Sequence, residues 1–220
     1  MGGRLDDGLS GGGRAPVRHP PGCGLVPSRS PGDHRSQNPL PTTAKLSPLT
    51  LDADELAAVE QDPQVSAIVA APTRDKLRLI TELAARIAVS TTNLHEHELV
   101  DRAFRIITSD HDHHPDKAEV CNQLFAWMDT LLRQAYTAFE SSGMGDKAGP
   151  IPGHETVHGR LLLQRACVET LKKALADDDP AYVAYTTARQ AGATQPDRAN
   201  GDEGRVRALL LAAHHVYDQG

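Results

Sequence analysis

The sequence predicts an all-α fold, a single bundle of six to seven helices preceded by a disordered N-terminal tail. Apolar residues from residue 49 onward recur at the three- and four-residue spacing of amphipathic helices, and no segment alternates with the period of two that strands require. Aromatic residues make up only 4% of the 220 residues, so the core must be built mostly from Leu, Ile, Val and Ala, a composition that suits helices. The composition also changes sharply near Pro48, which separates the tail (residues 1–48) from the helical domain (residues 49–220).

The tail is rich in residues that do not form a packed core. Residues 1–48 contain nine of the 18 glycines, eight of the 15 prolines and no aromatic residue. Such a segment buries too little apolar surface to offset the entropy lost on ordering, so we predict that it is disordered. One hypothesis is that it is translated upstream sequence and that the native start lies further along the chain. The alternative is a weakly basic tail with a binding role.

The first helices carry recognisable start signals. Asp52 and Glu55 have the spacing of a capping box, in which each side chain bonds the other's backbone N–H. Asp62 is placed as a cap with Pro63 at the first helical position, and Pro72 ends that segment. Together with the apolar periodicity, these signals predict helices over residues 51–60, 62–71, 73–90 and 94–108.

The longest predicted helix runs from Pro115 to about Ser141. Two adjacent apolar stripes follow it, a pattern typical of a central helix with several neighbours, so we expect the bundle to pack around this helix. Three further helices are expected over residues 154–176, 180–190 and 203–218.

Composition also bears on location. No apolar run approaches the roughly 18–20 residues that cross a bilayer, and the N-terminus lacks a secretory signal, so we expect a cytoplasmic protein with no membrane partner. Three cysteines without paired spacing argue against a disulfide framework.

The segment SDHDHHPDK, residues 109–117, raises the question of a metal site. In an extended chain His111 and His113 point to the same side, as a chelating pair does. The simpler interpretation is that Pro115 begins a helix and holds His114 extended in a capping position. We favour the cap and keep the metal site as an alternative.

A second histidine pair has the form of a zinc protease motif. The residues HETVH place His154 and His158 four apart, with Glu155 in the position of the general base. The motif occupies the first turn of its predicted helix, and its histidines share a face with charged residues. The places where the extended protease pattern has Gly and His hold Leu161 and Gln164. We therefore interpret it as a solvated helix face, and we keep zinc hydrolysis by Glu155 as an alternative.

The stretch ITELAARIAVSTTNLHEHEL resembles the helix-turn-helix pattern of DNA-binding regulators. Ala84, Ala88, Val89, Ser90 and Leu94 fit that pattern, which covers about 20 residues of the chain. The resemblance implies a tight turn just before Val89, with Ala88 where that turn usually has glycine, and a second helix that reads DNA. That second helix would carry three acids and no Lys or Arg before residue 102, which leaves DNA phosphates without a counter-charge.

The net charge also argues against nucleic acid. The tail has six Lys/Arg and three Asp, a net charge of +3, which leaves 17 basic and 26 acidic residues and a net charge of −9 in residues 49–220. We therefore predict a non-enzymatic interaction or regulatory protein that needs no cofactor and binds a protein partner, with homo-oligomerisation as a further possibility. A metal-dependent hydrolase that uses zinc and a helix-turn-helix regulator are the two alternatives.

Overall fold

Eight α-helices and one short 3₁₀ helix make up the part of the chain that the computed structural model describes, residues 51–109, 114–142, 155–195 and 201–219. No strand occurs in these residues, which confirms the all-α prediction; the eight α-helices correspond to the eight segments predicted one by one and exceed the overall figure of six to seven. The predicted tail lies outside the described residues. Within these ranges no helix is long and apolar enough to cross a membrane. The elements are α1 (Ala53–Glu60), α2 (Pro63–Ala70), η1 (Arg74–Lys76), α3 (Leu77–Thr92), α4 (Glu98–Thr108), α5 (Lys117–Ser141), α6 (Val157–Ala174), α7 (Pro180–Gly192) and α8 (Gly201–Asp218).

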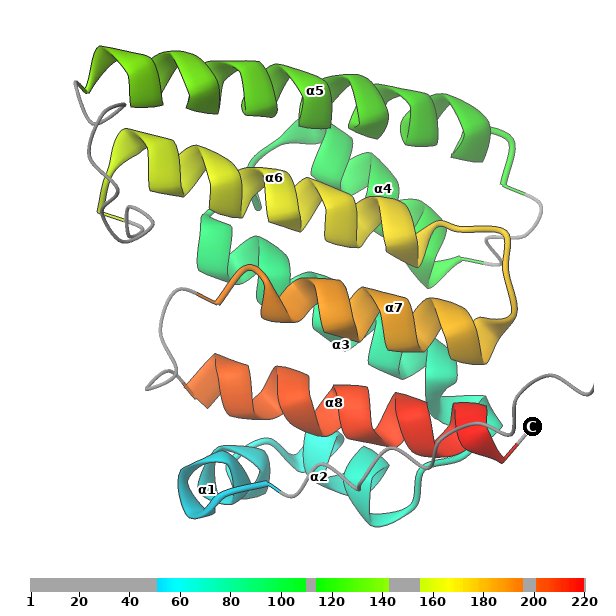
Figure 1. Cartoon of the computed structure of the whole chain (residues 1–220). Helices are drawn as coiled ribbons and strands as arrows, with labels where there is room; N and C mark the ends of the chain where they lie inside the picture. The colour runs from blue at the N-terminus through cyan, green and yellow to red at the C-terminus, as the bar shows by residue number, and fades with distance from the viewer. Residues whose placement is uncertain (1–50, 110–113, 143–154, 196–200, 220) are drawn as a thin grey trace, which may run out of the picture. The chain divides into compact units, whose positions relative to one another are not determined.

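The last four helices form one layer. α5, α6, α7 and α8 lie side by side in chain order, and each runs opposite to the one before it (Figure 1). α3 packs on one face of this layer against α6, α7 and α8, while α4 packs against α5 and α6. α1 and α2 pack on α8 at the edge of the layer (Figure 1). α3, α6 and α8 therefore each contact four other α-helices, and α3 is the one that lies across the face of the layer.

The prediction that residues 115–141 form the central helix is wrong. α5 occupies an edge of the layer, and its main contacts are α6 and α4 (Figure 1). Its wide apolar face is divided between those two neighbours and solvent, because Val120 and Leu124 are buried while Phe125 is 60% exposed. The broad apolar stripe of α5 therefore contacts two flanking helices along part of its width and is exposed to solvent along the rest.

Two of the predicted start signals are confirmed. The Glu55 N–H donates to Asp52 Oδ1 at 2.9 Å and the Asp52 N–H donates to Glu55 Oε2 at 2.8 Å, which completes the capping box of α1. Asp62 caps α2, with Pro63 at the first helical position. These contacts satisfy N–H groups that have no partner inside the helix.

The buried core contains no aromatic ring. Its large, fully buried side chains are Leu, Ile and Val, and small residues such as Ala84, Ala85 and Ala88 fill the buried face of α3. All eight aromatic residues of the sequence lie among the described residues, and each is at least partly exposed. The aliphatic core expected from the composition is thus confirmed; Phe104, Trp127 and Tyr185 are partly buried against it, and no ring is fully buried.

Two contacts bring α1 and α2 onto α8. The buried Glu55 carboxylate bonds Arg207, and Arg205 lies 3.4 Å from Asp62. Between these pairs, α8 approaches α1 so closely that a Cβ added at Gly204 would lie 2.9 Å from the Cα of Glu55 and 3.3 Å from the Cβ of Ala58. Only glycine fits this crossing without a shift of backbone.

We therefore expect Gly204→Ala to lower the free energy of unfolding by about 1–3 kcal/mol, since the added methyl group meets backbone and outweighs the better helix propensity of alanine. Gly192→Ala is the matched control, because its Cβ would meet only Val206 Cγ1, at 3.9 Å. Urea unfolding followed by far-UV circular dichroism measures both. Equal stability of the two variants would show that the α1–α8 approach is not tight.

Candidate functional site

The histidine-rich segment before α5 is only partly described. His111 and His113 lie outside the described residues. His114 accepts the backbone N–H of Asp116 on Nδ1 at 3.2 Å, and its carbonyl accepts the N–H of Lys117 at 3.1 Å. The side chain of His114 thus helps to form the turn that leads into α5. The helix begins at Lys117, two residues later than predicted, because Pro115 and Asp116 belong to that turn.

The HETVH motif does not lie on one helix. α6 begins at Val157, and Thr156 is its N-cap in an extended conformation, with its hydroxyl oxygen accepting the Gly159 N–H at 2.9 Å. The predicted helix start at His154 is therefore wrong, since the threonine cap places Glu155 ahead of the helix. A zinc protease holds the residues between its two histidines on one continuous helix, whereas here Glu155 and Thr156 lie ahead of α6. His154 itself lies outside the described residues.

His158 has a structural contact. Its Nδ1 donates to the Ala135 carbonyl of α5 at 2.8 Å, and its ring packs against Phe139 with centroids 5.2 Å apart. It thus joins the start of α6 to the end of α5. Among the described residues, no group of three or more His, Cys, Asp or Glu side chains could hold a metal ion.

The helix-turn-helix geometry is also not formed. α3 continues through Ala88 and ends at Thr92, where Asn93 adopts a left-handed conformation with φ 55°. The turn falls at residues 93–97, and α4 begins at Glu98. His97 caps α4 by accepting the Leu99 N–H on Nδ1 at 3.2 Å, and its ring stacks on Trp127 at 4.0 Å. The residues that fit the pattern therefore belong to one unbroken helix and a later turn.

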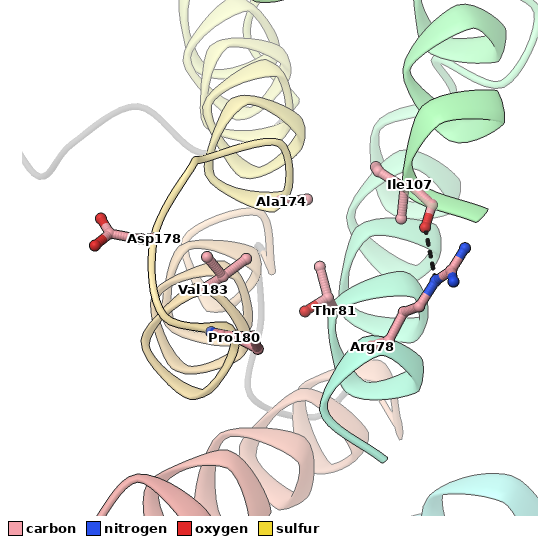
Figure 2. Close-up of a pocket in the computed structure, with 7 residues that line it drawn as sticks. All are labelled: Arg78, Thr81, Ile107, Ala174, Asp178, Pro180 and Val183. Atoms are coloured by element: carbon pink, nitrogen blue, oxygen red, sulfur yellow. Dashed lines mark hydrogen bonds between the residues drawn. The ribbon is translucent and has the colours of Figure 1, made fainter. Parts of the chain in front are cut away.

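A small pocket lies among α3, α4, α6 and α7, and Figure 2 shows its lining. Its volume is about 140 Å³, well below the roughly 300–1,000 Å³ of typical ligand pockets. Arg78 donates to the Ile107 carbonyl at 3.3 Å, and Thr81 donates to the Leu77 carbonyl at 3.1 Å. The Asp178 carboxylate points away from the other lining side chains (Figure 2). The lining residues therefore bring no acid and base together.

The two described thiols are poorly placed as nucleophiles. Burial raises the pKa of Cys121, although Lys117 and Lys172 partly oppose this. Burial raises the pKa of Cys167 from its ordinary value of 9.0 to about 11, and a hydrogen bond with Thr92 offsets only part of the effect. A raised pKa lowers the fraction of reactive thiolate at neutral pH.

The surface offers a clearer candidate than the interior. Tyr182 and Tyr185 on α7 meet His214 and Tyr217 on α8, and we call these four residues the tyrosine strip. Tyr217 lies 6.2 Å from both Tyr182 and Tyr185, measured between ring centroids, and Tyr185 lies 5.7 Å from His214. Tyr182 is 41% exposed and Tyr217 is 47% exposed.

The strip follows from helix geometry. Residues three apart share a face of a helix, so Tyr182 and Tyr185 line one side of α7, while His214 and Tyr217 line one side of α8. α7 and α8 are adjacent and antiparallel, which brings the two pairs together (Figure 1). His214 is held by Asp218, with Nδ1 and Oδ2 3.2 Å apart. Three of the four tyrosines in the sequence therefore lie together, with Tyr182 and Tyr217 exposed and Tyr185 partly buried against the core.

Sequence reasoning missed this strip. It considered the histidine motifs and did not consider the tyrosines. The i, i+3 spacing in YVAY (182–185) and HHVY (214–217) was the available signal. That spacing places two aromatic residues on one face of each helix. The packing of α7 against α8, which brings the two faces together, belongs to the tertiary structure and has no local sequence signal.

Comparisons of the chain with protein-family models, with curated proteins and with solved structures find no match. The function is therefore argued from the surface itself.

The thiols provide a test of the interior. In a Cys23→Ser variant at pH 8, we expect iodoacetamide to label Cys121 more slowly than free cysteine and Cys167 more slowly still, because a pKa of about 11 reduces the thiolate fraction roughly 100-fold. Peptide mass spectrometry over time measures both rates. Denaturation in urea should make the two rates equal. Labelling of folded Cys167 at the rate of free cysteine would mean that the α3–α6 contact is open.

Proposed function

We propose that this chain is a non-enzymatic helical protein of the cytoplasm that binds a protein partner through the tyrosine strip. The observation that carries the proposal is the placement of the rings, since Tyr182, Tyr185 and Tyr217 lie together outside a core that contains no ring. Tyrosine is enriched at protein interfaces because its ring buries a large area while its hydroxyl stays hydrogen-bonded. A few central aromatic residues supply much of the affinity at such interfaces.

The rigidity of the platform supports the same function. Tyr182 lies in the first turn of α7, which Asp179 caps through the Ala181 N–H at 2.9 Å. Both helices also contribute buried residues next to the strip, among them Ala184, Ala188, Leu209 and Ala213. Rings on two packed helices are fixed before a partner arrives, which reduces the entropy cost of binding.

The test is partner capture with the full chain from a lysate of its host. We expect Tyr182→Ser/Tyr217→Ser to lose a protein that the unchanged chain retains in a defined ratio, because loss of one interface tyrosine can cost about 2 kcal/mol, roughly 30-fold in affinity. Tyr136→Ser is the matched control, since Tyr136 is 62% exposed and lies on α5, away from the strip.

Two outcomes would contradict the proposal. Retention of the same proteins by the strip variant and the unchanged chain would place any interface elsewhere. Turnover of a substrate that survives in the strip variant would show an enzyme whose site is not the strip.

A further inference from the structure

Two phenylalanine rings on other helix pairs have basic side chains of the chain itself against them. The Arg86 guanidinium lies 5.5 Å from the centre of the Phe104 ring, and the Lys172 ammonium lies 4.9 Å from that of Phe125. A cation over an aromatic face is attracted by the negative charge of that face. On the α3–α4 and α5–α6 pairs, the chain therefore places a cation from one helix over a ring of its neighbour.

The tyrosine strip differs in this respect. Among the described residues, Tyr182, Tyr185 and Tyr217 have ring contacts with one another and with His214, and no Lys or Arg side chain lies over them. Tyr182 and Tyr217 also keep more than a third of their surface open. The strip is thus a set of adjacent rings with no basic side chain over them, whereas Phe104 and Phe125 each have one within about 6 Å of the ring centre.

Carboxylates lie at the same end of the α7–α8 pair. Asp218 follows Tyr217 directly, is 53% exposed at its side chain and is 3.2 Å from His214, whose ring contacts Tyr185. Asp178 and Asp179 lie just before α7, about one helical turn ahead of Tyr182. Arg74 forms an ion pair with Asp179 at 3.0 Å. The exposed Arg or Lys side chain nearest in sequence to the strip is Arg189, one turn of α7 after Tyr185. The net charge of −9 in residues 49–220 adds a long-range attraction for a basic partner.

We propose that the tyrosine strip binds an arginine-bearing basic segment of a partner protein, with guanidinium groups stacked on the tyrosine rings and paired with the Asp218 carboxylate. This inference rests on the proposed function and names the chemistry of its partner. Arginine fits better than lysine, because its planar group stacks on a ring and bonds a carboxylate through two N–H groups at once. A second copy of the chain fits less well, since two chains of net charge −6 repel each other.

The test uses three fluorescent twelve-residue peptides that are identical except at four positions, which hold arginine, lysine or the uncharged arginine analogue citrulline. Fluorescence anisotropy with the full chain gives each dissociation constant at several salt concentrations. We expect the arginine peptide to bind at least several-fold more tightly than the lysine peptide, and the citrulline peptide to bind weakest.

Variants locate the binding. Tyr182→Ser/Tyr217→Ser should weaken the arginine peptide roughly 10-fold or more, and Asp218→Asn should weaken it several-fold and reduce the salt dependence. Tyr136→Ser should leave the affinity unchanged. The inference would be overturned if the arginine and lysine peptides bound with equal affinity and the strip variants bound both as tightly as the unchanged chain. Net charge alone would then explain the binding. Absence of binding by every peptide would overturn the inference as well.

The inference and the proposed function fail separately. If the captured partner depends on the strip but the arginine peptide does not compete with it, the inference is wrong and the proposed function stands. The strip-dependent partner could prove to be a second copy of the chain. In that case the solution mass of the protein would rise with its concentration and would be lower in the strip variant, and the basic-segment inference would also be wrong. If capture shows no dependence on the strip, the proposed function itself fails.

Discussion

The close packing of α3 against the other helices is the constraint on which the rest of this structure depends. Ala84, Ala85 and Ala88 give α3 a thin buried face, and α6, α7 and α8 pack against that helix. Interiors are packed as densely as organic crystals, so short side chains at a contact bring helices close and leave no space for a ring. The eight aromatic residues consequently lie at the rims of the helix pairs, where they are at least partly exposed.

That arrangement links fold to function. A ring that is excluded from the core is still held by the helices beside it, so it presents a fixed apolar face to solvent. Most rings are partly covered from within the chain, as Phe125 is by Lys172 and Trp127 is by His97. The tyrosine strip is the place where adjacent rings present their faces together, which is why the proposed function rests there and not on the histidine motifs.

Much of the fold follows from the sequence, and the errors have physical causes. The starts of α1, α2 and α7 were predicted well because aspartate caps and prolines mark them locally. The starts at Leu94 and His154 were placed too early, since the caps are His97 and Thr156 and the sequence pattern continues ahead of them. The central position was assigned to α5 because its apolar face is wide, whereas small residues, not wide faces, mark the enclosed helix α3.

The candidate site was less accessible to sequence reasoning. Short motifs such as HETVH suggest a site because their residue spacing matches one helical turn. A single N-cap residue, here Thr156, decides whether the residues before it belong to the helix. The strip has the opposite character, because its residues come from two helices and no local pattern joins them. Its recognition required the pairing of α7 and α8.

The measurement that tests this account most directly is the free energy of unfolding of a variant in which Tyr182, Tyr185 and Tyr217 are all serine, compared with that of Leu209→Ala. Leu209 is fully buried, so its truncation should cost about 2–5 kcal/mol. The account predicts that the serine variant loses less than half as much, because the core does not depend on the rings. A loss as large as that of Leu209→Ala would contradict it, since the tyrosines would then be structural residues and not a surface held ready for a partner.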